Sequence, residues 1–298
     1  MNSIEEILKP TLEKNFKSYF IHAIEHLVEE TQTESNILQV IVNIQASLEI
    51  LSKLYVLNNF GWEKIIENKF HNKSAEDIEQ LIYNGMLKTK NFNSIKEILL
   101  DNIQLDDTDS ELLNNFQKYR NQVMHLGVEN LSEDILDEAV WFIVRIINIL
   151  GWQDILKIQN QYLNNSLASL LGEALYKKLI LKSGYIDEAI DNAESKYDDV
   201  KYCFICGNNT LGANDWDDNY KCLVCGCQIS NDNSVEYIDC PKCHMKESVI
   251  YDALNISGNE YLKAMCCACK TYTYVSECNT CHEVYIYKDT CSFCNDNS

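Results

Sequence analysis

Cysteine is absent from the first 202 of the 298 residues, although the whole chain contains 14 cysteines. Proline occurs only twice and arginine only at positions 120 and 145. Basic residues are scarce overall, with 25 Lys and Arg against 45 Asp and Glu and a net charge of −20. Tight, sequence-independent binding to long nucleic acids needs a broad basic surface. The composition therefore disfavours a basic nucleic-acid-binding protein, and leaves open a protein partner or a nucleic acid held in a local cleft.

Signals for export or membrane insertion are also lacking. Residues 1–10 contain acidic residues where a signal peptide would have Lys or Arg, so we expect no export signal. The longest apolar stretch, 139–152, is interrupted by Arg145 and Asn148. It is too short and too polar to span a bilayer and predicts a buried helix. We therefore expect a cytoplasmic protein with no membrane association, in which thiols stay reduced and repeated cysteine pairs indicate metal binding rather than disulfides.

Six Cys-x-x-Cys pairs fill the last third of the chain. They are Cys203/Cys206, Cys222/Cys225, Cys240/Cys243, Cys266/Cys269, Cys278/Cys281 and Cys291/Cys294. Two thiolates three residues apart on a tight turn can both reach one tetrahedral Zn²⁺ at about 2.3 Å. Two pairs complete a site, so the pairs predict three structural zinc ions per chain, bound by these twelve cysteines. Paired in chain order, each site suits a short β-hairpin between its two turns.

Four further residues near these pairs leave alternatives open. Cys227 and Cys267 remain outside the pairs. Each is either a spare buried thiol or an alternative ligand that shifts the pairing. His244 and His282 each follow the second cysteine of a pair. We expect turn residues there, although either histidine could replace a thiolate.

The first 200 residues have the pattern of a helical domain. Ser3-x-x-Glu6 predicts a capping box, and apolar residues that recur every three or four positions predict two long antiparallel helices over 12–27 and 37–55. Gly61 should end the second of them. Further helices are expected near 62–70, 74–88, 94–101, 108–126, 131–150, 152–182 and 185–197, with Thr108 as an N-cap and Gly127 as a terminator.

The pattern changes after residue 201. Turn-forming residues surround the cysteine pairs, and the runs 248–251 and 283–287 predict hairpin strands. Metal binding itself should fold these modules, because their apolar residues are too few for independent cores. The predicted fold class is an all-helical bundle followed by three tandem zinc ribbons. The predicted domains are a helical bundle at 1–160, a helical extension or linker at 161–200, and the zinc ribbons at 201–298.

One helix, 111–126, contains residues suited to chemistry. Its predicted apolar stripe consists of Leu112, Phe116, Tyr119 and Val123. Asn121 and His125 are four residues apart on the opposite side, and Arg120 lies on the flank. By itself this pattern predicts a solvated helix face. However, one of the two arginines is here, and a histidine in the last turn is favoured as imidazolium by the helix dipole.

The sequence Arg120-Asn121-x-x-x-His125 resembles the R-(N/D/H)-x-x-x-H core of the R-x4–6-H motif of the HEPN superfamily (higher eukaryote and prokaryote nucleotide-binding domains). The resemblance covers about residues 1–160. It implies a metal-independent endoribonuclease whose site is shared across a homodimer. His125 would exchange protons with the ribose 2′-OH and the leaving 5′-oxygen, Arg120 would stabilise the phosphate, and Asn121 would orient the histidine. The products would be a 2′,3′-cyclic phosphate and a 5′-hydroxyl.

Many domains of this superfamily are toxins or phage-defence effectors, and others have lost catalysis and only bind nucleotides or partners. Gly127 stands where the variant controlled by tyrosine adenylylation has its tyrosine, so that form of control is not supported. We expect an RNA-cutting homodimer whose zinc ribbons recognise a target or trigger, with a protein partner as one possibility.

Three other hypotheses compete with this one. The first is a non-catalytic adaptor that binds a protein or nucleotide. The second is a zinc-ribbon nucleic-acid binder with a structural bundle, which the acidity of the ribbons disfavours. The third is an inverted zinc protease, because His22-x-x-Glu25-His26 matches H-x-x-E-H. We interpret the last pattern as a helix surface, since no second acidic ligand is identifiable. The modest basic cluster of Lys88, Lys90 and Lys96 predicts a solvated surface.

Overall fold

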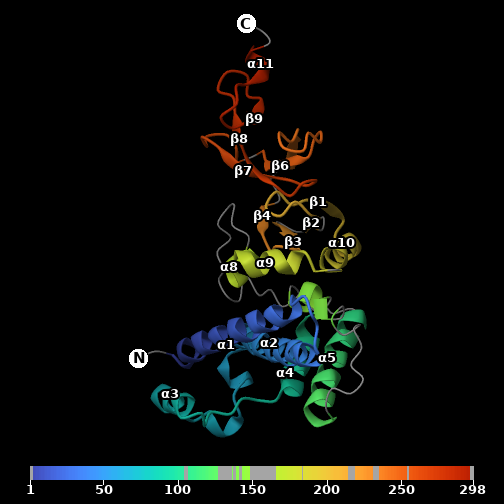
Figure 1. Ribbon diagram of the computed structural model, residues 1–298. Coiled ribbons are helices and arrows are strands. Elements are labelled where there is room, and N and C mark those ends of the chain that lie inside the picture. Colours follow the sequence, from blue (N-terminus) through green and yellow to red (C-terminus); the bar gives the residue numbers. More distant parts are fainter. Residues whose placement is uncertain are drawn as a thin grey trace. The chain divides into compact units, whose positions relative to one another are not determined.

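The chain forms two compact units in the computed structural model, residues 1–158 and residues 159–298 (Figure 1). The structure describes residues 3–103, 107–126, 136, 139–140, 143–147, 166–182, 184–213, 219–230, 235–253 and 255–295. Helices make up the first unit. Among its described residues, the second contains two β-sheets with three helices ahead of them. This order, helices followed by sheets that contain cysteine clusters, confirms the predicted fold class.

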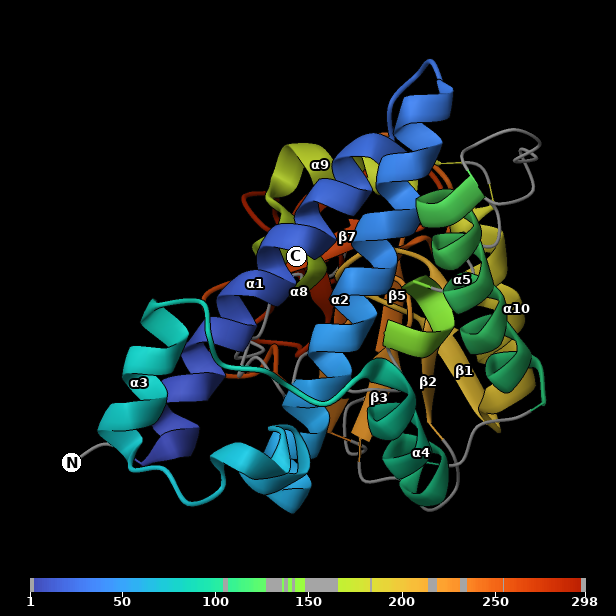
Figure 2. The ribbon, with the colours of Figure 1, turned by 90° about the horizontal axis from the view of Figure 1, so that it is seen from below.

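Two long helices open the first unit, α1 (Ile4–Leu27) and α2 (Glu34–Phe60), and they lie side by side (Figures 1 and 2). The predicted capping box starts α1: Ser3 Oγ accepts a hydrogen bond from the Glu6 N–H, and Glu6 Oε2 accepts one from the Ser3 N–H at 2.7 Å. Gly61 ends α2 with a φ of 86°, a conformation that side chains with a Cβ rarely adopt. Both predicted boundaries are therefore confirmed.

The core of the first unit lies between these helices. Phe16 and Phe20 of α1 are stacked with ring centroids 5.4 Å apart, and both are buried. Leu48 and Leu51 of α2 are fully buried as well. By length and composition alone α2 could cross a membrane, but 72% of its most apolar window is buried inside the unit. Such burial is typical of the core helix of a folded domain.

Shorter elements form the rest of the described part of the first unit. They are the 3₁₀ turns Trp62–Lys64 and Asn68–Phe70, α3 (Ala75–Tyr83), α4 (Phe92–Asn102), α5 (Asp107–Leu126) and a π-helical turn at Ile143–Ile147. Thr108 lies within α5 and is not its N-cap, because helical structure already includes Asp107. Gly127 and most of the helix predicted at 131–150 lie outside the described residues.

In the described part of the second unit, three helices precede the sheets: α8 (Ser166–Leu171), α9 (Glu173–Ile180) and α10 (Tyr185–Lys196). They pack against the first sheet. The Tyr185 hydroxyl donates to the carbonyl of Val224 at 3.2 Å, and the Leu167 N–H donates to the carbonyl of Cys225 at 3.1 Å. The segment predicted as an extension or linker thus contributes helices to the same compact unit as the cysteines.

Both sheets of the second unit are antiparallel throughout. The first has the order β1 (Asp199–Tyr202), β2 (Asn209–Ala213), β3 (Asn219–Cys222), β4 (Gln228–Ser230). The second has the order β5 (Val235–Ile238), β6 (Val249–Asp252), β7 (Leu262–Cys266), β8 (Tyr272–Glu277), β9 (Val284–Ile286). A short helix, α11 (Ser292–Asn295), follows. Strands β6 and β9 match the strands predicted from sequence.

Candidate metal centres

Five of the six Cys-x-x-Cys pairs adopt one and the same turn. In each, the N–H of the first cysteine donates to the carbonyl five residues later, and the residue after the second cysteine donates back to the first cysteine's carbonyl. At Cys203 these bonds, from its own N–H and from that of Gly207, are 2.8 and 2.6 Å long. The turn also places backbone N–H groups against sulfur, as at Cys222 Sγ, 3.5 Å from the Cys225 nitrogen. The sixth pair flanks and enters α11.

The residue after the second cysteine has a left-handed backbone in all five turns. These residues are Gly207, Gly226, His244, Lys270 and His282, with φ between 54° and 71°. His244 and His282 are therefore turn residues, and the three clusters in the described part of the chain contain only cysteine. His282 Nδ1 lies 2.7 Å from Glu277 Oε1, which gives this side chain a partner other than a metal.

Two clusters consist of consecutive Cys-x-x-Cys pairs. One contains Cys240, Cys243, Cys266 and Cys269, and the other contains Cys278, Cys281, Cys291 and Cys294. In the first cluster, the Sγ–Sγ distances between the two turns are 3.8 Å for Cys240 and Cys269 and 3.8 Å for Cys243 and Cys266. In the second cluster, they are 3.7 Å for Cys278 and Cys294 and 3.5 Å for Cys281 and Cys291. Four sulfurs at about 2.3 Å from one tetrahedral zinc are about 3.8 Å apart. The thiols thus already have the spacing that a shared ion requires.

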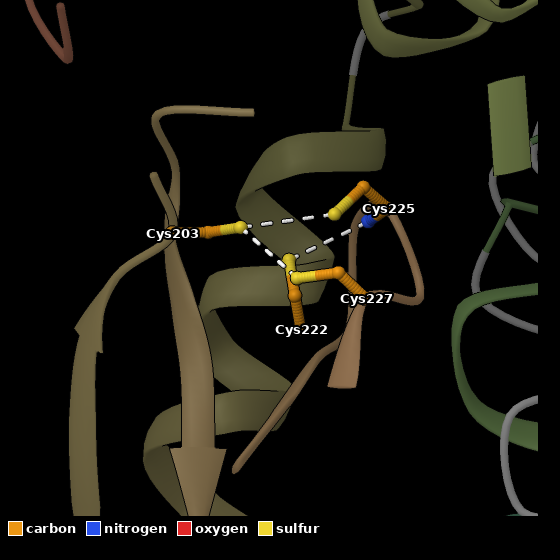
Figure 3. A group of neighbouring side chains, drawn as sticks. All are labelled: Cys203, Cys222, Cys225 and Cys227. Atoms are coloured by element: carbon orange, nitrogen blue, oxygen red, sulfur yellow. Dashed lines mark hydrogen bonds between the residues drawn. The ribbon is translucent and has the colours of Figure 1, made fainter. Parts of the chain in front are cut away.

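Five thiols meet at the remaining cluster, on the first sheet. Cys203, Cys222, Cys225 and Cys227 lie within 4.8 Å of one another (Figure 3). Cys203 Sγ is 3.7 Å from Cys225 Sγ and 3.3 Å from Cys227 Sγ. The fifth thiol belongs to Cys206, whose Sγ is 3.6 Å from that of Cys222. The predicted ligand set left Cys227 out, and the structure brings it into the cluster.

Each cluster contains at least one thiol with a strongly lowered pKa. The first contains two, because burial raises the pKa of Cys222 but hydrogen bonds with neighbouring thiols lower it well below the usual value. Burial raises the pKa of Cys203, but hydrogen bonds with neighbouring thiols outweigh it and bring the pKa to about 6. For Cys266, burial again raises the pKa, and the backbone N–H of Cys269 is the largest of the contributions that lower it to about 6. Backbone N–H groups of its own turn, that of Cys281 first, lower the pKa of Cys278 to about 6. A metal ion binds the thiolate form of cysteine, so a lowered thiol pKa reduces the free-energy cost of deprotonating the ligand.

The donor sets fit zinc. Four thiolates in a tetrahedron are typical of structural Zn²⁺, and four protein ligands leave no open position for a substrate. The chain thus has three four-cysteine clusters, each able to hold a metal ion, as predicted. Cys267, of intermediate exposure, belongs to none of the clusters found in the described residues.

The residues of the HEPN-like motif lie on α5 in the first unit. Arg120 and Asn121 are exposed, and Arg120 Nη1 donates a hydrogen bond to Asn121 Oδ1 at 3.1 Å. The backbone of His125 belongs to the last turn of α5, but its side chain lies outside the described residues. The exposure of Arg120 and Asn121 fits a helix face turned away from the core of its own unit.

The buried face of α5 differs from the predicted stripe. Leu113, outside that stripe, is 2% exposed, whereas Tyr119 is only half-buried. The side chains of the other three stripe residues, Leu112, Phe116 and Val123, lie outside the described residues. The helix contacts α2 and also the turn Ile143–Ile147.

The other arginine has a different environment. Arg145 Nε lies 2.7 Å from Asp109 Oδ1, and the two side chains are 13% and 6% exposed. This pair joins α5 to the π-helical turn inside the core of the first unit. Arg145 thus has a structural position, and Arg120 is the exposed arginine.

The protease-like pattern on α1 forms a helix surface, as interpreted from sequence. His22 Nδ1 lies 3.1 Å from Glu25 Oε2, with both side chains at least half exposed. His22 and His26 are in edge contact, and His26 Nδ1 lies 3.3 Å from Asn36 Oδ1. Within the described residues, these side chains belong to no group of three potential metal ligands.

Comparison of the chain with models of known protein families, with characterised proteins and with solved structures found no match.

Proposed function

We propose that the first unit is a HEPN-type endoribonuclease that cuts RNA without a metal ion, and that the second unit is a zinc-stabilised module that recognises a target or trigger. The motif Arg120-Asn121-x-x-x-His125 carries this proposal, because its arginine and asparagine lie exposed side by side on α5. The setting supports it: a helical unit that opens with two long helices packed side by side.

The chemistry of these side chains fits cleavage by the ribose 2′-hydroxyl. The 2′-oxygen attacks the phosphorus, the bond from phosphorus to the 5′-oxygen breaks, and a proton moves from the 2′-hydroxyl to the leaving oxygen. His125 is the proton carrier in this proposal. The planar guanidinium of Arg120 binds the phosphate through two N–H groups and stabilises the charge that develops there. Asn121, one helical turn before His125, orients it.

One copy of the motif supplies one histidine, whereas this reaction needs both a base and an acid. We propose that a homodimer supplies the second histidine, through a two-fold axis that passes the exposed face of α5. A toxin or phage-defence effector is the biological role that this chemistry favours.

The surface of the second sheet supports the recognition role. Tyr261 and Tyr274 are exposed and in edge contact, and Tyr287 packs on Tyr261 at a centroid distance of 4.6 Å. The ammonium group of Lys263 lies 3.6 Å from the ring centroid of Tyr272. Exposed tyrosines are enriched where proteins bind proteins. The net charge of −20 favours a protein partner over a long nucleic acid at this surface.

A digest of single-stranded RNA by matched variants tests the proposed activity. We expect Arg120→Ala and His125→Ala each to lower the cleavage rate by about 10²- to 10⁴-fold, and Asn121→Ala to lower it less. Gln122→Ala is the control, since Gln122 is an exposed neighbour on the same helix with no role in the proposed chemistry. Equal activity in all variants, or no cleavage by any of them, would favour the non-catalytic adaptor.

A further inference from the structure

The first metal centre has one more thiol than a tetrahedral ion can bind. Cys203, Cys222 and Cys225 are common to two possible sets of four. Cys206 completes one set, with its Sγ 3.6 Å from Cys222 Sγ. Cys227 completes the other, with its Sγ 3.3 Å from Cys203 Sγ.

We propose that this centre has two interchangeable fourth ligands, so that either Cys206 or Cys227 completes the coordination of one zinc ion held by the three shared thiolates.

The set with Cys206 repeats the geometry of the other two centres. In those, the second cysteine of the first turn lies 3.8 or 3.5 Å from the first cysteine of the second turn. Cys206 and Cys222 are the corresponding residues here, at 3.6 Å. By this measure Cys206 is a ligand as good as its counterparts Cys243 and Cys281.

The set with Cys227 is compact, since its four sulfur atoms lie within 4.8 Å of one another. The backbone fixes this cysteine near the ion, because the Cys227 carbonyl accepts the N–H of Cys222 at 2.9 Å. Cys227 is thus anchored by the same turn that positions Cys222 and Cys225. Both Cys206 and Cys227 are buried, with 4% of each residue exposed.

Space beside Cys206 allows it to leave the ion. Its side chain lines a cavity of about 400 Å³, together with Met265, Tyr272 and Lys270. In the exchange, one zinc–sulfur bond breaks and another forms, and a proton passes from the incoming thiol to the outgoing thiolate. Four thiolates bind the ion before and after the step, and no electrons are transferred. The two states therefore have the same charge and the same donor set.

Zinc counting in single and double variants of the full chain tests this inference. We expect Cys206→Ala and Cys227→Ala each to retain three zinc ions per chain, and the double variant to retain two. Cys243→Ala is the matched control in the second centre, and we expect it to retain two. Loss of one ion from either single variant would make that cysteine the sole fourth ligand and overturn the proposal, as would three ions in the double variant.

Cobalt substitution gives a second readout, which reports how many thiolates bind each ion. Tetrahedral Co²⁺ bound by four thiolates absorbs visible light strongly, and the intensity falls when a thiolate is lost. We expect the single variants Cys206→Ala and Cys227→Ala to keep the absorption of three four-thiolate sites. The double variant should lose about one third of it. A loss of one third of the visible absorption in either single variant would contradict the proposed exchange between Cys206 and Cys227.

Discussion

Replacement of Arg145 should destabilise the first unit strongly, whereas replacement of Arg120 should not. These are the only arginines of the chain. Arg145 Nε lies 2.7 Å from Asp109 Oδ1, and the side chains are 13% and 6% exposed. Arg120 is exposed. Among the described residues, the hydrogen bond of its side chain is the one to its neighbour Asn121. The same substitution at the two positions therefore separates a structural arginine from a candidate for phosphate binding.

The size of the effect follows from burial. Removal of one member of a buried ion pair costs about 3–5 kcal/mol, because the remaining charge loses the opposite charge that offsets its desolvation. We expect Arg145→Ala to lower the free energy of unfolding by about 3 kcal/mol, a large part of the 5–15 kcal/mol that is usual for a domain of about this size. A substitution at an exposed position such as Arg120 changes the free energy of unfolding by about 0.5 kcal/mol or less.

Urea unfolding of the zinc-loaded chain, followed by circular dichroism at 222 nm, measures both effects. The double variant Arg145→Met with Asp109→Leu should recover much of the loss, because it removes both charges and keeps similar volume. A loss below about 1 kcal/mol for Arg145→Ala would contradict a buried pair that stabilises the unit. A loss of about 3 kcal/mol for Arg120→Ala would make Arg120 structural and remove the main support for the proposed site.

Three further results are expected. Protein purified without chelator should contain three zinc ions per chain, and a chelator should unfold the second unit, including α8–α10, but preserve the helical signal of α1–α5, as circular dichroism will show. Gly207→Ala should weaken zinc binding at the first centre about tenfold in a chelator competition, since Gly207 has a φ of 70° and a Cβ there would lie 2.9 Å from Met265 Cγ. An excess of His125→Ala subunits, exchanged with wild type, should lower RNA cleavage more than dilution does.

Features set by residues close in sequence are predictable from the sequence of this protein. The start of α1 depends on Ser3 and Glu6, and the end of α2 depends on Gly61, so each boundary needs only a few neighbouring residues. The Cys-x-x-Cys turns are equally local, because their backbone hydrogen bonds span four or five residues. Pairing the turns in chain order also yields the second and third centres. The hairpin expected between the turns is present in the second centre, as β6 and β7. In the third, the strand between the turns is β9, which pairs with β8 ahead of both turns.

Features set by contacts between distant segments are not predictable in this way. Cys227 joins the first centre because β4 begins directly after the second turn and pairs with β3, which holds its sulfur near that of Cys203. Helix α10 packs on the first sheet through the bond from the Tyr185 hydroxyl to Val224, and nothing in its periodicity indicates which unit it joins. The burial of Leu113 depends in the same way on the segments that contact α5.

The end groups of cleaved RNA test the proposed activity most directly. The full chain, without added Mg²⁺ and exposed to EDTA only briefly, should cut single-stranded RNA and leave 2′,3′-cyclic phosphates and 5′-hydroxyls. This result is expected because His125 and Arg120 supply the proton transfer and the charge stabilisation without a metal ion. Products with 3′-hydroxyls, or an absolute requirement for Mg²⁺, would contradict the proposed mechanism.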